Sequence, residues 1–393
     1  MTIKHDKANP VKRILYLSSA GDVAGSEIAL LQYLQHYESK RYEISVVCCQ
    51  TGKFPSRLHD EGIPHVVTPL IISLKGILQP SLIIQNITSL WNIYRQLNDT
   101  SVDLVVTNDT MVLKILFLPL LYCRTPVIYH LRNYEWKRLW MVRRLFRKPH
   151  THGIAVSNAV RKHYKNVVGI PDRLISVVHL STPSTNARTS KKTKSLRREL
   201  QLSRNHRLIG LVARFDVWKG HLTLLRAIER VAKQFPAVHL AIVGEILNPE
   251  TFPFLVEYKA KVLQYASRPG LTTRVHFLGW RNDMPNVFRS LDIVVNASES
   301  EPFGLVTLEA MTYGIPIIGS DSGGTPEIIV HEKNGMLFRT GDDADLAQHL
   351  LLLLQQPRRA KQLAVQGRAT VRKHFTMQAY INSIEQQYDR ILS

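Results

Sequence analysis

Two successive series of short apolar runs, each alternating with helix-like segments, constrain the fold of this 393-residue chain. The first half has apolar runs at residues 13–17, 44–48, 102–107, 126–130, 154–157 and 175–179. The second half has them at residues 208–214, 238–244, 275–278, 293–295 and 315–319. Buried strands that alternate with helices are typical of parallel βαβ units. We therefore predict an α/β protein of two doubly wound halves with a cleft between them.

A polar break separates the two series. Residues 181–207 contain Pro183, several Ser and Thr residues and a basic run, a composition typical of a linker that leads into a polar helix. We expect an N-terminal domain at residues 1–185, a linker at 186–206 and a C-terminal domain at 207–376. The amphipathic segment 377–393 is expected to return to the first domain.

Composition narrows the choice of partners and compartment. The formal net charge of +20 favours anionic partners such as nucleotides, nucleic acid or the anionic membrane surface. The three cysteines include the adjacent Cys48 and Cys49, whose side chains would point to opposite faces of a strand, so we predict neither a disulfide framework nor a metal cluster. The first ten residues are polar, and the longest apolar run, 111–123, is shorter than a membrane span. We expect a soluble, cytoplasmic protein in which residues 111–123 form a buried helix.

The most informative motif lies between the apolar runs at 293–295 and 315–319. Glu301 and Glu309 enclose a Pro-Phe-Gly turn that leads into a helix-like segment. Open α/β sheets bind ligands at the carboxyl ends of their strands, and the free N–H groups of a helix N-terminus bind anions. We therefore expect the two carboxylates to accept hydrogen bonds from two hydroxyl-rich parts of one ligand.

A second motif follows the first strand of the second series. Arg214 and Lys219 lie five residues apart around a predicted turn. An arginine can bind two phosphate oxygens at once, and a lysine is a movable point charge, so the pair suits a diphosphate. The glycine loop at Gly21 and Gly25 is less specific, because its spacing does not match a dinucleotide fingerprint, and a plain tight turn stays an alternative.

Together these residues resemble the GT-B glycosyltransferases of family 4, which are retaining enzymes with nucleotide-sugar donors. The matching stretches in the second half are 210–220, 277–279, 298–309, 323–327 and 334–335. The first half matches more weakly, through the glycine loop, His130 and residues 156–158. The Asn-Gly pair that the family commonly has after the last strand of the first domain is absent, since Val-His-Leu-Ser occupies 178–181. The resemblance implies a GT-B fold of two Rossmann-like domains facing a central cleft.

The resemblance also implies site residues. The implied donor-binding residues are Gly21, Gly25, Arg214, Lys219, Gly279, Phe303, Gly304, Leu305 and Glu309. The implied catalytic residues are His130, Arg214, Lys219 and Glu301. Arg214 and Lys219 would hold the donor diphosphate and Glu309 the ribose, while His130 and Glu301 would lie beside the transferred sugar. The donor would be a UDP- or GDP-sugar, with no bound cofactor and no metal. We interpret Asp342, Asp343 and Asp345 as residues that favour a helix N-terminus.

The expected activity is retaining transfer of a hexose-type sugar to a glycan, lipid-linked or small-molecule acceptor in cell-surface polysaccharide synthesis. Glu301 is a weak candidate for a nucleophile, so we expect the leaving diphosphate to take the acceptor's proton. The alternatives are a sugar-nucleotide epimerase or a phosphorylase of the same fold, and a basic nucleic-acid-binding protein, although no nucleic-acid motif is present.

The basic, aromatic stretch Arg132–Lys148 is expected to contact an anionic membrane surface or to line an acidic acceptor, and the alternative is a solvated helix with a few packed aromatic residues. Within it, Trp136, Trp140 and Arg143 fall at helical spacing. Contact with the membrane would place the protein on the cytoplasmic face.

Overall fold

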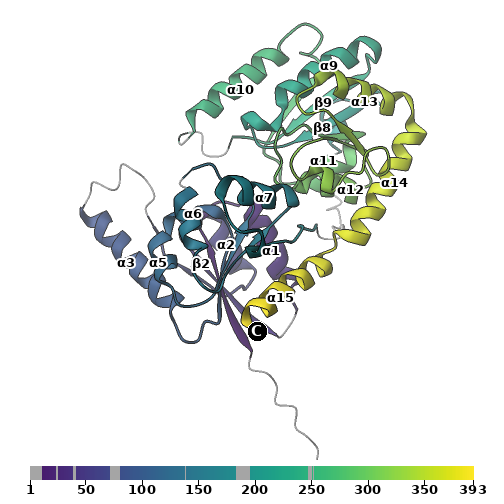
Figure 1. The fold of residues 1–393 in the computed structure, drawn as a ribbon. Coiled ribbons are helices and arrows are strands. Elements are labelled where there is room, and N and C mark those ends of the chain that lie inside the picture. Colours follow the sequence, from purple (N-terminus) through teal and green to yellow (C-terminus); the bar gives the residue numbers. More distant parts are fainter. Residues whose placement is uncertain are drawn as a thin grey trace, which may run out of the picture. The chain divides into compact units, whose positions relative to one another are not determined.

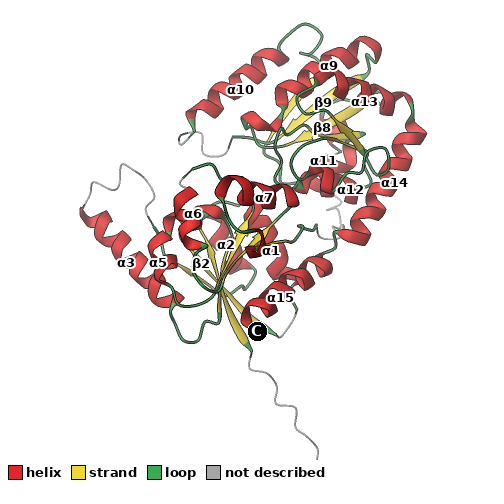
Figure 2. Cartoon of the chain, in the orientation of Figure 1, coloured by secondary structure: helices red, strands yellow, loops and turns green. Residues whose placement is uncertain are grey.

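The computed structural model describes residues 11–23, 25–38, 41–70, 80–137, 139–182, 195–246, 250 and 252–393. The chain forms two compact units (Figure 1). Unit 1 comprises Met1–His179 with Met377–Ser393, and unit 2 comprises Leu180–Thr376. Each unit contains one parallel sheet with helices packed around it (Figure 2), which confirms the predicted α/β class. Of the expected linker, residues 186–194 lie outside the described residues.

The sheet of unit 1 has seven strands in the order β3-β2-β1-β4-β5-β6-β7. The strands are β1 (Lys12–Ser18), β2 (Tyr42–Cys48), β3 (His65–Val67), β4 (Leu104–Thr107), β5 (Val127–Leu131), β6 (Thr151–Ala155) and β7 (Ile175–Val177). Because β1 pairs with β2 on one side and with β4 on the other, the sheet is doubly wound, as predicted. The strand predicted at 154–157 begins earlier, at Thr151.

Helices of unit 1 connect these strands. They are α1 (Gly25–His36), α2 (Lys53–Asp60), α3 (Pro80–Leu97), α4 (Thr110–Ile115), α5 (Phe117–Tyr122), α6 (Leu139–Leu145), α7 (Asn158–His163), the π-helical turn η1 (Tyr164–Val168), the 3₁₀ turn η2 (Asp172–Leu174) and α15 (Met377–Leu392). Among the described residues, no helix is both long and apolar enough to cross a bilayer.

Two helix predictions in unit 1 need correction. The single buried helix expected at residues 111–123 is divided at Leu116 into α4 and α5, and Leu118 and Tyr122 are exposed. The helical spacing assigned within residues 132–148 is wrong for its first part, because α6 begins only at Leu139 and Trp136 precedes it. Arg132 follows β5 directly and is buried.

The sheet of unit 2 has six parallel strands in the order β10-β9-β8-β11-β12-β13. The strands are β8 (Arg207–Val212), β9 (Val238–Val243), β10 (Val275–Gly279), β11 (Ile293–Asn296), β12 (Ile317–Ser320) and β13 (Met336–Phe338). The helices are α8 (Leu196–Glu199), the 3₁₀ turn η3 (Val217–Lys219), α9 (His221–Gln234), α10 (Pro253–Ala266), α11 (Met284–Ser290), α12 (Leu305–Thr312), the 3₁₀ turn η4 (Thr325–Glu327), α13 (Asp343–Gln355) and α14 (Pro357–His374).

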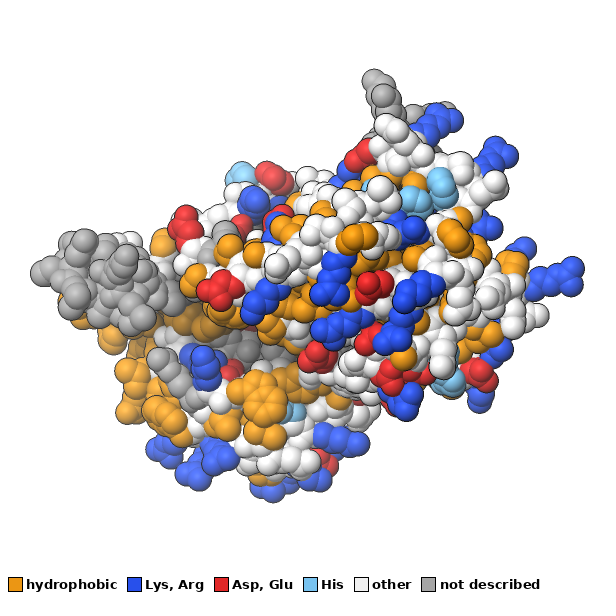
Figure 3. Space-filling model, turned by 90° about the horizontal axis from the view of Figure 1, so that it is seen from above, with side chains coloured by type: hydrophobic (Ala, Val, Ile, Leu, Met, Phe, Trp, Pro, Cys, Tyr) orange, Lys and Arg blue, Asp and Glu red, His pale blue; other side chains and the backbone are white. Residues whose placement is uncertain are grey.

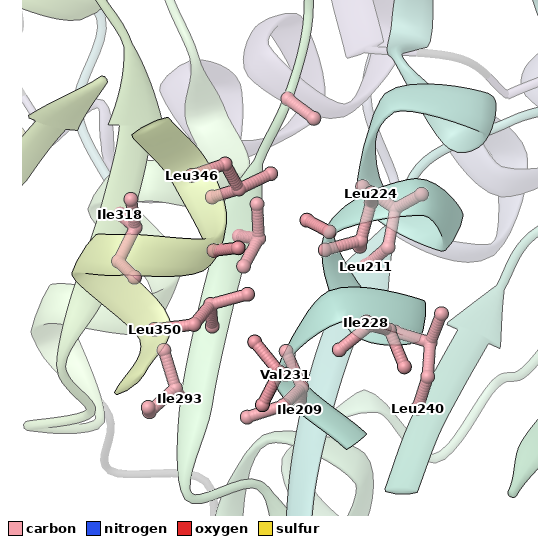
Figure 4. Packing of buried hydrophobic residues seen from close by; sticks show 14 of the residues in the cluster. Ile209, Leu211, Leu224, Ile228, Val231, Leu240, Ile293, Ile318, Leu346 and Leu350 are labelled. Atoms are coloured by element: carbon pink, nitrogen blue, oxygen red, sulfur yellow. The ribbon is translucent and has the colours of Figure 1, made fainter. Parts of the chain in front are cut away.

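The core of unit 2 forms where α9 and α13 cover the sheet. Leu224 and Ile228 of α9 meet Leu211 of β8, while Leu346 of α13 lies toward Ile318 of β12 (Figure 4). The buried residues of α9 recur at helical spacing, which puts one apolar face against the strands. This packing fixes the strand ends from which the loops of the candidate site emerge.

Helix α15 packs within unit 1 through a cluster of tyrosines. The hydroxyl groups of Tyr16 and Tyr388 are hydrogen-bonded to each other in the core. At the surface, Arg41 forms an ion pair of 2.7 Å with Asp389. Buried positions 377, 380, 381, 384 and 388 lie on one face of α15, so the helix buries an apolar stripe against the sheet and α1.

We predict that Tyr388→Ala lowers the free energy of unfolding by about 3 to 5 kcal/mol, since it removes a fully buried ring and leaves Tyr16 without its partner. Urea denaturation followed by tyrosine fluorescence measures the change. The matched control is Gln386→Ala on the exposed face of the same helix, where the change is expected to stay within about 0.5 kcal/mol. Equal effects of the two substitutions would contradict the packing described.

Candidate functional site

The candidate site of unit 2 lies where the order of its strands reverses. Strand β8 pairs with β9 on one side and with β11 on the other. The loop after β8 carries Arg214 and Lys219, and the loop after β11 carries Glu301. In open α/β sheets, ligands bind outside the carboxyl ends of the strands, at the point where the strand order reverses. The topology therefore brings the two sequence motifs to one position.

The two loops touch through their backbones. Gly220 has φ of 71°, and a Cβ atom placed there would come within 2.0 Å of the Ala297 carbonyl oxygen. The Glu299 N–H donates a hydrogen bond of 2.8 Å to the Trp218 carbonyl. Only glycine allows both this conformation and this close approach. The contact holds Lys219, next to Gly220, beside the Glu301 loop.

A salt bridge joins the two loops at their side chains. The Lys219 Nζ lies 2.7 Å from Glu301 Oε2, and each side chain is only 14% exposed. The same ammonium lies 3.9 Å from the centre of the Trp218 ring. Arg214 approaches the other part of this cluster, 5.9 Å from the Trp218 ring, and its guanidinium lies 3.3 Å from Asp216. The Trp218 ring therefore forms cation–π contacts with both Arg214 and Lys219.

The backbone of Glu301 is fixed from a third loop. The Gly324 N–H donates a hydrogen bond of 2.7 Å to the Glu301 carbonyl. A Cβ atom on Gly323, which has φ of 59°, would lie 2.2 Å from the same oxygen. The glycines after β12 thus permit the tight packing that positions the Glu301 carboxylate.

Glu309 occupies the second turn of α12. This helix begins at Leu305 after Gly304, whose φ of 112° sets the turn. Among the described residues, the half-buried Glu309 carboxylate has no hydrogen bond or ion pair, and burial raises its pKa to about 7. The ring of Phe303 is buried, and its centre lies 6.0 Å from that of Phe375. Phe303 can therefore offer a ligand only its backbone polar groups.

Gly279 lies apart from this cluster. It ends β10, and β9 separates β10 from β8. Its φ of 60° favours glycine, and a Cβ atom there would meet no other group within 4 Å. The Asp342 side chain caps α13 by accepting hydrogen bonds of 3.0 Å from the Ala344 and Asp345 N–H groups, as the helix N-terminus interpretation requires.

The glycines predicted in the first half have different local roles in unit 1. A Cβ atom on Gly21 would lie 2.5 Å from the Thr51 carbonyl oxygen, and the Phe54 N–H donates to the Gly21 carbonyl at 2.9 Å. Gly21 therefore allows two loops of unit 1 to pack together, which supports the tight-turn alternative for this residue. Gly25 begins α1, and nothing lies within 4 Å of a Cβ atom there.

His130 lies near the carboxyl end of β5 and is 2% exposed. Arg132 Nη2 donates to His130 Nδ1 at 3.3 Å, because a guanidinium can only donate. The histidine proton is therefore on Nε2, which has no hydrogen-bond partner among the described residues. Burial, with a smaller effect of Arg132, holds the pKa of His130 well below its usual value, so the ring is neutral.

Two residues of these sites were not predicted from the sequence. Trp218 stands between Arg214 and Lys219, and its place inside a basic loop is a usable signal because aromatic faces bind cations. Arg132 lies two residues after His130, so alternation along an extended segment puts both side chains on one face. Among the described residues, no group of three or more His, Cys, Asp or Glu residues is arranged to hold a metal ion.

Family comparisons agree with this geometry. The model described as "Glycosyl transferases group 1" matches residues 192–370, and the model described as "Glycosyltransferase Family 4" matches residues 23–181. The chain belongs to the group 1 glycosyltransferases of family 4. This membership accounts for both sheets, since the first match spans most of unit 2 and the second most of unit 1.

Curated relatives match this chain over about half of its length. The chain is 27% identical over 197 residues to N-acetyl-alpha-D-glucosaminyl L-malate synthase of Bacillus anthracis, covering 50% of this chain and 49% of that protein. It is 28% identical over 194 residues to the lipopolysaccharide core biosynthesis glycosyltransferase LpsD of Rhizobium meliloti, covering 49% and 52%. The matches thus span about half the length of these curated relatives.

A solved structure matches nearly the whole chain. HepE of Anabaena, crystallised in complex with UDP-glucose, aligns with a TM-score of 0.81 and 25% identity over 96% of this chain and 99% of HepE. The similarity extends through both sheets and confirms the GT-B fold expected from the motifs.

We predict that Glu309→Gln changes the free energy of unfolding of the ligand-free protein differently at two pH values. The change should be more favourable at pH 8 than at pH 5 by about 1 to 2 kcal/mol. Burial raises the pKa of this carboxyl from 4.5 to about 7, so the folded state binds the proton more tightly than the unfolded state. Wild-type stability is therefore lost as the pH rises between these values, and a neutral amide avoids the loss. Urea denaturation at both pH values measures the difference. Glu257→Gln on the exposed surface of α10 is the control, and equal pH profiles for the two variants would refute the assignment.

Proposed function

We propose that this protein is a retaining glycosyltransferase that transfers a hexose-type sugar from a nucleotide-diphosphate sugar. The observation that carries the proposal is the Lys219–Glu301 pair at the strand reversal of unit 2. The Lys219 cation suits the diphosphate of such a donor, and the Glu301 carboxylate beside it suits the hydroxyls of the sugar. UDP is the favoured nucleotide because the similar HepE structures were solved with UDP and with UDP-glucose.

Each part of the donor has a group of matching chemistry. Arg214 and Lys219 supply positive charge for the diphosphate. The Glu309 carboxylate, which has no partner among the described residues, would accept hydrogen bonds from the two ribose hydroxyls. The backbone of Gly304 and Leu305, at the start of α12, would face the diphosphate with free N–H groups. In this proposal the ligand supplies the polar partner that Glu309 lacks.

The proposed reaction breaks the bond between the sugar C1 and the diphosphate oxygen. The bonding electron pair goes to the leaving oxygen, whose new charge is stabilised by Lys219 and Arg214. The acceptor hydroxyl attacks C1 from the face that the diphosphate leaves, and its proton passes to the leaving phosphate oxygen. The new glycosidic bond therefore keeps the configuration at C1, and no enzyme nucleophile is needed.

Glu301 has an electrostatic role in this scheme. Its carboxylate is already paired with the Lys219 ammonium at 2.7 Å, which reduces its strength as a nucleophile. When a diphosphate attracts Lys219, the Glu301 oxygens become acceptors for sugar hydroxyls. His130 would contribute the opposite function from unit 1, because its Nε2–H is a buried donor suited to a sugar hydroxyl.

The proposed acceptor is a cell-envelope glycan or its lipid-linked precursor. This acceptor class is supported by the similarity to LpsD, which is named as a glycosyltransferase of lipopolysaccharide core biosynthesis. A peripheral location on the cytoplasmic face of the membrane would suit such an acceptor. Within the basic stretch 132–148, Trp136 and Trp140 are 67% and 63% exposed, as expected of side chains that enter a lipid interface.

We predict that UDP, at about one hundred times its dissociation constant, raises the melting temperature by about 5 °C or more. Differential scanning fluorimetry measures the shift. Uridine is the matched control, because it lacks the phosphates that Arg214 and Lys219 would bind. The absence of a shift with both UDP and GDP would count against the proposed function.

We predict that Lys219→Ala lowers the rate of UDP release from UDP-glucose by about 10² to 10³, because it removes the charge that stabilises the leaving group. Glu301→Gln should lower that rate only about tenfold, since the amide still accepts a hydrogen bond. Coupled detection of UDP release, with water as the acceptor, measures both variants. A loss of about 10⁴ or more for Glu301→Gln would indicate a covalent nucleophile and overturn the proposed mechanism.

A further inference from the structure

A cavity of about 700 Å³ lies in unit 1 at the amino-terminal edge of the sheet. Its lining includes Thr151, the first residue of β6, together with the chain after α6 and the end of α15. His130, in contrast, is the penultimate residue of the parallel strand β5. Since the strands run in one direction, the cavity and His130 lie at opposite edges of the same sheet.

The cavity is lined by cations without a counter-ion. Arg147, Arg173 and Arg390 belong to the lining, and none of the described residues that line the cavity is Asp or Glu. The two carboxylates adjacent to them in sequence are engaged elsewhere, since Asp172 pairs with Arg161 at 2.8 Å and Asp389 pairs with Arg41 at 2.7 Å. Among the described residues, Arg147, Arg173 and Arg390 form no ion pair.

This distribution of charge differs from that around the other cavity and over most of one face of the molecule. On the face shown in Figure 3, Lys and Arg side chains are interspersed with Asp and Glu side chains. A second cavity, of about 930 Å³ in unit 2, contains Arg359 in its lining, but Glu332 lines the same cavity and pairs with it. Like charges around one concave surface repel each other, and the repulsion is relieved when an anion binds between them.

Other cations of the lining hold the walls in place. Arg143 donates to the backbone carbonyls of Val167 and Val168. Lys148 Nζ donates to the carbonyls of Leu120 and Cys123 at 2.5 and 2.7 Å. These contacts satisfy carbonyls at the ends of helical segments. The cavity wall is therefore preformed. Of the other three arginines, Arg390 Nη1 donates one hydrogen bond of 3.4 Å to the Ser176 hydroxyl, and its remaining donors are left for a ligand.

A buried polar group also lines this cavity without a partner. Thr151 is 5% exposed, and its hydroxyl has no hydrogen bond among the described residues. The neighbouring His152 is buried as well, and its Nε2 is hydrogen-bonded to the Ser176 hydroxyl at 2.8 Å. An unsatisfied buried hydroxyl is costly, so it indicates a place where a further acceptor or donor is missing.

We propose that this cavity binds a phosphate-bearing anion, at a site separate from the donor site. One guanidinium group can bind two phosphate oxygens at once. Arg147, Arg173 and Arg390 come from three different segments that surround one cavity. The shared ligand chemistry is a phosphoester on a small polar group. Its source is either the headgroup of an anionic phospholipid or a free phosphate ester.

The test removes the three charges and leaves the walls intact. The variant combines R147Q, R173Q and R390Q, all at exposed positions, and R144Q on the adjacent exposed position serves as the control outside the lining. Titration with glycerol 3-phosphate measures soluble binding. Co-sedimentation with phosphatidylcholine vesicles, with and without phosphatidylglycerol, measures binding to headgroups. The melting temperature and its shift with UDP report on folding and on the donor site.

Wild-type protein is expected to bind at least one probe, and the triple variant to bind that probe at least about tenfold more weakly. The control should bind as the wild type does, and the UDP shift should be the same in all three proteins. Binding to phosphatidylglycerol vesicles alone assigns a lipid headgroup, whereas binding of glycerol 3-phosphate assigns a free ester. The proposal is overturned if wild type binds neither probe, or if the triple variant and the control lose binding equally. Loss of the UDP shift in wild type would instead contradict the proposed function and leave this site standing.

Discussion

The candidate site of unit 2 depends on the close approach of two backbones, the loop after β8 and the loop after β11. Gly220 meets the Ala297 carbonyl so closely that no side chain fits, and the Glu299 N–H is bonded to Trp218. This contact determines the distance between Lys219 and Glu301, because each side chain extends from one of the touching loops. A small change in either loop would therefore alter the geometry of both charged groups together.

The charged side chains of this site can exchange their present contacts for contacts with a ligand. A salt bridge with both side chains 14% exposed has already lost much of its hydration, and such pairs often add little net stability. Glu309, in contrast, has a raised pKa and no partner in the part of the chain that the structure describes, so it weakens the ligand-free fold at neutral pH. Both features are understandable if an anionic, hydroxylated ligand completes the site. Stability is then lower in the empty protein, and binding recovers part of it.

Local patterns predicted most of the fold, and the exceptions have physical reasons. Long apolar runs gave β1, β8 and β9 nearly to the residue, whereas β3 and β13 have three residues each and leave no periodic signal. The sequence contained the charged motifs, but the pairing of Lys219 with Glu301 spans 82 residues and required the order of the strands. The helix assigned through Trp136 was wrong because spacing alone cannot show where a helix begins.

Net charge by itself does not distinguish structural cations from binding cations, and unit 1 shows why. Arg143 and Lys148 look equivalent to Arg147 in the sequence, yet the first two are committed to backbone carbonyls. Arg161 and Arg41 are likewise occupied by carboxylates. When these contacts are set aside, Arg147, Arg173 and Arg390 surround one cavity, and no Asp or Glu residue of the described part of the chain lines it. The excess positive charge of the chain is therefore most informative where several arginines without an ion pair surround one concave surface.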